Sequence, residues 1–119
     1  MQDFFESYAQ GYIDQDFARI ERHFAYPCML TNEGGTDLIC DAADLEQHIG
    51  GFLAQLKEGG LAKAAPTILH DLHHGANNRV ISVNWKLSGA DGRLLVDTDF
   101  LYVLVGGEGN WKISLANLL

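Results

Sequence analysis

The sequence is poor in basic residues and cysteine, and it has no long apolar run. Eight Lys and Arg residues stand against 16 Asp and Glu, which gives a formal net charge of −8, and the basic residues are scattered singly. Because nucleic acids and anionic membrane surfaces are bound through clustered positive charge, both kinds of partner are disfavoured. Two cysteines are too few for a disulfide scaffold, and their spacing matches no metal site.

No apolar stretch approaches the ~18 residues needed to cross a bilayer, and the first residues lack the basic start of a signal peptide. We therefore expect a cytoplasmic protein. Its 119 residues, of which 47% are hydrophobic, fit a single domain over residues 1–119 with one core.

The last third of the chain carries the alternation of apolar and polar residues that is typical of strands. Three such runs cover residues 79–88, 93–105 and 111–119, and glycine-rich turns join them. The middle run places Asp97 and Asp99 in the same phase, between apolar neighbours. The pattern predicts a β-meander with two acids in the middle of its sheet.

Upstream, apolar residues recur at helical spacing in three segments. The first, residues 3–13, has one aromatic stripe made of Phe4, Phe5, Tyr8 and Tyr12. The second covers residues 17–24 and is expected to end at Pro27. The third is predicted to begin at an Asp41 N-cap and to stop at Gly59.

Between the second and third helices, residues 28–32 and 36–40 predict a hairpin with a three-residue loop centred on Gly34. This register places Cys28 opposite Cys40, with Cβ atoms ~5 Å apart and near disulfide range. In a reducing compartment we expect two thiols packed side by side rather than a disulfide.

The order of these elements resembles the nuclear transport factor 2-like superfamily, which includes ketosteroid isomerase, scytalone dehydratase, limonene epoxide hydrolase and SnoaL-like polyketide cyclases. The resemblance is carried by residues 8–24, Pro27, residues 102–105 and, after a glycine-rich turn, residues 111–113. It implies an α+β fold, a cone-shaped barrel whose strongly curved mixed or antiparallel sheet wraps around the N-terminal helices. It also implies a pocket open at one end and a homodimer that packs through the outer face of the sheet.

The comparison with ketosteroid isomerase implies catalytic roles for residues of the first helix and the sheet. Tyr8 matches the tyrosine that donates a hydrogen bond to the substrate oxyanion, and Asp99, with Asp97 in the same phase, falls nearest the assisting acid. The position of the proton-abstracting carboxylate falls on Thr31 or Asn32, and neither side chain is ionisable. An enzyme of this kind would therefore need another base.

His70 is the candidate replacement, because imidazole titrates near neutral pH. It belongs to a strand expected over residues 67–73, in which Ile68, His70 and Leu72 share one face. A histidine on the sheet surface without a catalytic role is the alternative interpretation.

His73 and His74 follow His70 closely, but residues i and i+3 of an extended strand point to opposite faces. The three side chains therefore do not suit a single metal ion. We expect no metal and no cofactor.

Two orientations are open for the strand that carries Asp97 and Asp99. If the two acids face an apolar pocket, their mutual repulsion raises at least one pKa, as in a catalytic acid. If they face solvent, they form a polar outer stripe, and the opposite, more apolar face is the core. That opposite face carries Val96, Thr98, Phe100, Tyr102 and Leu104.

Further residues are candidates for the wall of a ligand pocket, because they are aromatic or polar and lie where the fold would place its cavity. They are Tyr12, Tyr26, Asn32, Phe52 and Trp85. Plain core packing is the alternative for Tyr8 and Tyr12. Such a wall suits a small, mostly apolar or aromatic ligand with one or two polar groups.

Two functions follow from this sequence. The first is a small-molecule-binding domain with a hydrophobic pocket, which as an enzyme would be a cofactor-independent isomerase, lyase or cyclase acting on a small hydrophobic or aromatic substrate. The second is a non-catalytic homodimeric interaction module of the same fold. The orientation of residues 93–105 separates them, because it decides which side chains reach the pocket.

Overall fold

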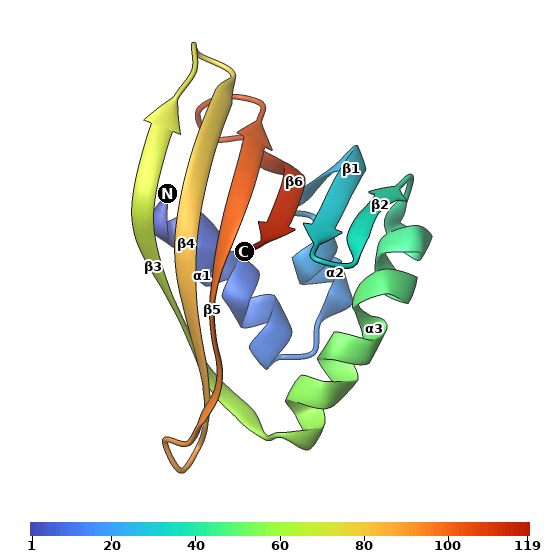
Figure 1. Cartoon of the computed structure of the whole chain (residues 1–119), viewed down its shortest axis with the longest axis vertical. Helices are drawn as coiled ribbons and strands as arrows, with labels where there is room; N and C mark the ends of the chain where they lie inside the picture. Colours follow the sequence, from blue (N-terminus) through green and yellow to red (C-terminus); the bar gives the residue numbers. More distant parts are fainter.

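The structure is a computed structural model that describes residues 1–119 as three helices and one six-stranded sheet (Figure 1). The elements in chain order are α1 (Gln2–Ile13), α2 (Phe17–Glu21), β1 (Phe24–Asn32), β2 (Gly35–Ile39), α3 (Ala42–Glu58), β3 (Leu61–His73), β4 (Asn78–Gly89), β5 (Leu94–Val105) and β6 (Lys112–Leu118).

The strand order is β2-β1-β6-β5-β4-β3. Every neighbouring pair is antiparallel except β1 and β6, which are parallel. The predicted α+β fold, its meander and its mixed sheet are confirmed. The sheet is not closed by hydrogen bonds, because β2 and β3 are its two edges.

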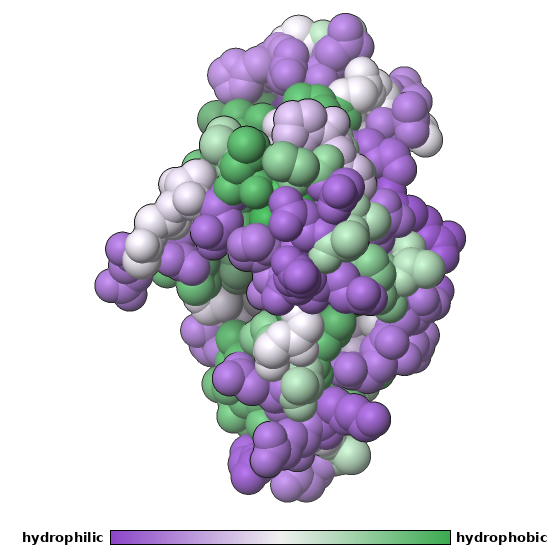
Figure 2. Space-filling view, turned by 90° about the vertical axis from the view of Figure 1, so that its right-hand side faces the viewer, coloured by the Kyte–Doolittle hydropathy of each residue, from purple (hydrophilic) through white to green (hydrophobic).

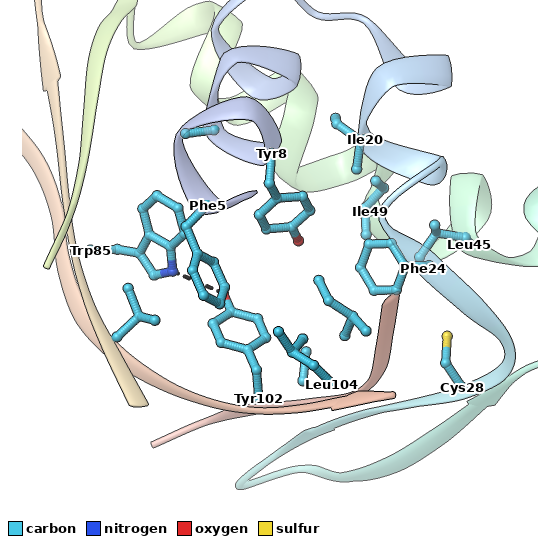
Figure 3. Packing of buried hydrophobic residues seen from close by; sticks show 14 of the residues in the cluster. Phe5, Tyr8, Ile20, Phe24, Cys28, Leu45, Ile49, Trp85, Tyr102 and Leu104 are labelled. Carbon is cyan, nitrogen blue, oxygen red and sulfur yellow. Dashed lines mark hydrogen bonds between the residues drawn. The ribbon is translucent and has the colours of Figure 1, made fainter. Parts of the chain in front are cut away.

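The sheet curves around α1, which lies on its concave side against β3 (Figure 1). The aromatic stripe of α1 enters the core, where Phe5 is fully buried and its ring centroid lies 5.1 Å from that of Tyr102 (Figure 3). Gly11 on the flank of α1 lets α2 approach, since a Cβ there would lie 2.7 Å from Ile20 Cγ1. Aromatic packing therefore fixes α1 inside the cone.

α3 runs along the side of the cone opposite β3 and β4 (Figure 1). It begins as predicted, because the Asp41 carboxylate accepts a hydrogen bond from the backbone N–H of Asp44 at 2.8 Å. It also ends as predicted, at Gly59, and Gly60 follows in the left-handed region with φ +71°. None of the three helices combines the length and the hydropathy that crossing a membrane requires.

α2 is shorter than expected and ends at Glu21 instead of continuing to Pro27. The chain continues as a strand because it pairs with β6. The N–H of Ile113 donates to the carbonyl of His23 at 2.7 Å, and Phe24 pairs with Ile113. A non-local pairing thus overrides the helical pattern, and Pro27 lies within β1.

The hairpin of β1 and β2 has a two-residue loop, so the predicted three-residue loop is wrong. Asn32 pairs with Gly35, and Cys28 consequently pairs with Ile39 rather than with Cys40. Cys28 is buried together with its partner Ile39, whereas Cys40 follows the last residue of β2 and is exposed. Both thiols are free, but they do not lie side by side.

β3 is almost twice as long as predicted, because the Ala-rich segment before Pro66 is also a strand. Pro66 has no N–H to donate, and it is tolerated here because β3 is an edge strand.

A β-bulge at Leu69 breaks the predicted phase of β3. Ile68 pairs with Val83, whereas His70, two residues later, pairs with Ser82, the direct neighbour of Val83. The extra residue moves His70 to the convex face, so Ile68 and His70 do not share a face.

Candidate functional site

A cavity lies between the concave face of the sheet, α1 and α3. It has an inner chamber of about 60 Å³ and an outer chamber of about 460 Å³. Both chambers are lined by the same aromatic and β5 side chains, namely Tyr8, Tyr12, Phe52, Val96, Thr98 and Phe100. The inner chamber also touches Trp85 and Tyr102, whereas the outer one is bounded by β1, β6 and α3. The outer volume falls in the range of small-molecule sites.

Two tyrosines of α1 supply the polar centre of this cavity. They are four residues apart and therefore share a helix face, and their hydroxyl oxygens lie 2.7 Å from each other. Burial raises the pKa of Tyr12 to about 12, and burial together with the neighbouring Tyr12 raises that of Tyr8 well above its usual range. Both hydroxyls are therefore protonated at neutral pH and act as donors.

A second polar pair closes the inner end of the cavity. The indole N–H of Trp85 donates to the Tyr102 hydroxyl at 2.8 Å, and this buried bond is drawn in Figure 3. Burial also raises the pKa of Tyr102. The Trp85 donor is used internally, which leaves its ring as apolar wall.

No carboxylate lines either chamber. In the outer chamber the polar side chains besides the tyrosines are Thr31, Asn32, His48 and Thr98. Asn32 uses its carbonyl oxygen to accept the N–H of Gly34 at 2.7 Å, so its NH₂ group is the part left to meet a ligand.

Asp97 and Asp99 lie on the convex face, so their placement in the pocket is wrong. Both are exposed, and the Asn84 amide donates to one carboxylate oxygen of each, at 2.9 Å and 2.8 Å. Of the two orientations of β5, the one with the apolar face inward is observed, and Thr98 between the two acids is the residue that reaches the cavity. Burial of apolar area decides the phase of this strand.

His70 and Tyr26 also lie outside the cavity. His70 is exposed on the convex face, so it does not replace the missing base. Tyr26 is half-buried, and burial together with the nearby Glu21 carboxylate raises the pKa of its phenol. Neither residue is brought to the site predicted for it.

The other predicted residues come together around the cavity. Tyr8, Tyr12 and Phe52 line both chambers, Trp85 lines the inner one and Asn32 the outer one. Tyr8 is also a core residue, only 6% exposed, so packing and lining are both properties of this side chain.

His48 is the lining residue that the sequence analysis missed. It lies on α3, three residues after Leu45 and four before Phe52, so it borders the apolar face of that helix, and it is itself exposed. Its Nδ1 lies 2.8 Å from the carbonyl oxygen of Asp44, and its Nε2 lies 3.9 Å from Asp37 Oδ1. Its helical spacing to Leu45 and Phe52 was the signal that could have found it.

The structure brings no three His, Cys, Asp or Glu side chains close enough together to hold a metal ion. Near the His70–His74 segment, Asp71 instead accepts two hydrogen bonds from Arg79, at 3.0 Å and 2.7 Å. These bonds lower the pKa of Asp71. This arrangement is an ion pair between β3 and β4.

The family model for NTF2-like protein (DUF6841) matches residues 1–117. The chain belongs to this family. No curated protein sequence matches the chain.

Solved structures share the fold at low identity. An NTF-2 like protein of unknown function from Shewanella oneidensis MR-1 superimposes with a TM-score of 0.73 at 12% identity, over 98% of this chain and 93% of that one. A candidate ketosteroid isomerase from Shewanella frigidimarina NCIMB 400 gives 0.73 at 16% identity, over 98% and 92%.

A candidate calcium/calmodulin-dependent protein kinase type II association domain from Thiobacillus denitrificans ATCC 25259 gives a TM-score of 0.73 at 11% identity, over 98% and 92% of the two chains. At these identities the similarity shows the fold alone, and the resemblance inferred from the sequence is confirmed at that level. Function has to be argued from the cavity of this NTF2-like chain.

Proposed function

We propose that this NTF2-like protein binds a small, mostly apolar or aromatic molecule that carries one hydrogen-bond-accepting oxygen. The observation that carries the proposal is the hydroxyl pair of Tyr8 and Tyr12 in the cavity. The wall around this pair is mostly apolar. One hydroxyl proton of the pair bridges Tyr8 and Tyr12 at 2.7 Å, and the other is free to donate to a ligand. The raised pKa values keep both protons in place at neutral pH.

The apolar wall selects the body of this ligand. The cavity is bounded by the rings of Phe52, Trp85 and Phe100, which favour a flat hydrophobic group. Because no carboxylate lines the chambers, a cationic ligand would find no counter-charge in the wall. A neutral ring ketone or phenol fits these conditions.

Calorimetric titration with 1-indanone tests the proposal, and indane, which lacks the oxygen, is the matched control. We expect saturable binding of the ketone and weaker binding of the hydrocarbon. The substitution Tyr12→Phe should weaken ketone binding by roughly 2- to 12-fold, the equivalent of one hydrogen bond of 0.5–1.5 kcal/mol, and leave indane unaffected. The proposal is wrong if neither compound binds saturably to the folded protein.

Two neighbouring alanines of β3 offer a second control. Ala64 lines the inner chamber, whereas Ala65 is the next strand residue and points to the convex face. We expect Ala64→Leu to fill the chamber and abolish binding, and Ala65→Leu to bind like the wild type. Equal loss in both variants would place the binding site elsewhere.

We propose in addition that the convex face pairs two copies of the chain. One row of directly paired apolar residues crosses all six strands, and from edge to edge it consists of Leu72, Val80, Val103, Leu115, Met29 and Leu38. At ~4.8 Å between strands the row spans about 24 Å. Its end residues Leu72 and Leu38 are 56% and 60% exposed.

The row is exposed at Leu72, Met29 and Leu38 and half-buried at its other three residues. Such a continuous apolar row favours an interaction surface, and a two-fold dimer would bury the row against itself. Figure 2, which faces the β1, β2 and α3 side, shows hydrophobic groups in the upper half and again at the lower left, separated by a more hydrophilic middle.

Sedimentation equilibrium tests the pairing. We expect the wild type at twice its monomer mass of 13.1 kDa and Val103→Glu, in the middle of the row, as a monomer. Gln47→Glu introduces the same charge at an exposed position of α3, away from the convex face, and should leave the dimer intact. A wild-type monomer at high concentration would overturn this second proposal.

A further inference from the structure

The inner chamber is the smaller and the more apolar of the two parts of the cavity. Its volume is about 60 Å³, and side chains of α1, α3, β3, β4 and β5 form its wall. Ala9 and Ala64 are the small residues of this wall, at positions where larger side chains would fill the space. Ala64 pairs with Leu87 across β3 and β4, and both residues line the chamber. The side chain at position 64 therefore limits how much room is left.

The polar groups of the inner wall leave little for a water molecule to bind. The indole N–H of Trp85 donates to the Tyr102 hydroxyl at 2.8 Å, and the hydroxyl oxygens of the tyrosine pair lie 2.7 Å apart. Thr98 is the one other lining side chain with a polar atom. A buried water needs about two to four polar partners, whereas an apolar chamber stays dry and its walls lack contacts on one side. An apolar group that enters the chamber gains those contacts.

The two chambers differ in the size of the group that they can hold. A benzene ring binds in a dry apolar cavity of about 150 Å³. The outer chamber, at about 460 Å³, exceeds that volume, and the inner chamber, at about 60 Å³, falls well short of it. An aromatic ring therefore has room in the outer chamber, and the inner chamber takes a short alkyl group.

Tyr8 and Tyr12 line both chambers, so a ligand oxygen that meets their hydroxyls has one chamber on either side. We infer that the ligand is an unsymmetrical ketone, with an aromatic ring on one side of the carbonyl group and a short alkyl group on the other. Ala64 is then the residue that determines how long the alkyl side can be. The inference rests on the proposed function, because it requires that the oxygen binds the tyrosine pair. In a ring ketone such as 1-indanone, the saturated edge of the second ring is the small side.

Calorimetric titration of the wild type with a series of phenyl ketones tests this inference. Acetophenone, propiophenone and benzophenone carry a methyl, an ethyl and a second phenyl group on the small side. Propiophenone should bind roughly 4-fold more tightly than acetophenone, the equivalent of one buried CH₂ group at about 0.8 kcal/mol. Benzophenone should bind more weakly than either, because its second ring needs more room than the inner chamber has.

Matched substitutions of alanine by valine locate the alkyl side within the cavity. Ala64→Val narrows the inner chamber, so propiophenone should lose its advantage over acetophenone. Ala65→Val, at the next strand residue on the convex face, should preserve that advantage. Ala116 lines the outer chamber alone, so Ala116→Val should weaken the binding of both ketones and leave their affinity ratio at roughly 4-fold.

The titrations separate failure of this inference from failure of the binding function. The inference is overturned, and ketone binding stands, if the three ketones bind the wild type equally well or if propiophenone keeps its advantage in Ala64→Val. If neither 1-indanone nor any phenyl ketone binds the wild type, the binding function fails and the inference fails with it. Far-UV circular dichroism verifies that each variant is folded, and the wild-type series decides the question if a variant is not.

Discussion

Gly11 and Gly50 are both helical glycines, but their surroundings differ. A Cβ on Gly11 would lie 2.7 Å from a side-chain carbon of Ile20 and 3.1 Å from its backbone nitrogen, whereas nothing lies within 4 Å of a Cβ on Gly50. We expect Gly11→Ala to lower the free energy of unfolding by about 1–3 kcal/mol through overpacking.

Gly50→Ala should instead raise the free energy of unfolding by about 0.5–1 kcal/mol, because alanine favours the helix and meets no obstacle. Urea titrations of both variants measure the contrast. Equal stabilisation by the two substitutions would mean that α2 does not press on α1 at Gly11.

His23 makes the stability of the protein depend on pH. It is 7% exposed, with Phe4 packed edge-on at 5.1 Å and Arg19 O within 2.8 Å of Nδ1. Burial lowers its pKa below the ordinary value near 6.5, so the unfolded chain binds the proton more readily than the folded one. Stability should therefore fall as the pH drops below about 6.5, until the folded protein is protonated as well.

The comparison of wild type with His23→Gln in urea titrations at pH 7.5, 6.5 and 5.5 isolates this effect. The difference in unfolding free energy between the two proteins should shift in favour of the variant as the pH falls. Asp71 acts in the same direction but only at lower pH, because its lowered pKa makes its stabilising contribution decline only once the pH falls below about 3.8. A difference in unfolding free energy that stays constant from pH 7.5 to 5.5 would contradict the conclusion that His23 is buried in its neutral form.

At the scale of elements, the start of α3 determines one wall of the outer chamber. The Asp41 cap bonds the N–H of Asp44, whose carbonyl in turn fixes His48. Asp41→Ala should lower the free energy of unfolding by about 1 kcal/mol, and Asp41→Ser, which restores a capping oxygen, should recover most of it. Denaturant unfolding measures both, and equal stability of the two variants would argue against the cap.

The elements that local patterns determine were predicted well from the sequence. The aromatic stripe with Tyr8 and Tyr12 predicted α1 and placed the two tyrosines on one face. The Asp41 cap and Gly59 predicted the two ends of α3. These signals lie within one helix each, so no knowledge of distant residues is needed to interpret them.

The errors came from pairings between distant segments. The bulge at Leu69 and the two-residue loop after Asn32 are set by which strand residues meet, and one residue of slip reverses the face of every following side chain. For β5 the alternation of apolar and polar residues alone favoured the observed orientation, in which the apolar side chains face the cavity. The comparison with ketosteroid isomerase favoured the opposite orientation, with Asp99 in the pocket. His48 was missed because the apolar helix face that it borders was interpreted as core only.

At the scale of the whole molecule, charge opposes the pairing of two copies. Each chain carries a formal charge of −8, so two copies that meet on the convex face repel each other over long range. If the apolar row provides the attraction, added salt should screen the repulsion and tighten the dimer. Sedimentation equilibrium between 0.05 and 0.5 M NaCl, where the Debye length falls from about 14 to about 4 Å, measures the association of two copies. Weaker association at high salt would indicate an interface of ion pairs.

The two edges of the open sheet have a consequence for how far association proceeds. β2 is only five residues long, and β3 is interrupted by Pro66 and by the bulge at Leu69. Neither edge offers the long, regular ladder that a further strand needs, so end-to-end growth of sheets into fibres is blocked. If the proposed two-fold pairing through the convex face holds, association stops at two copies, and a concentrated solution of this protein should stay clear.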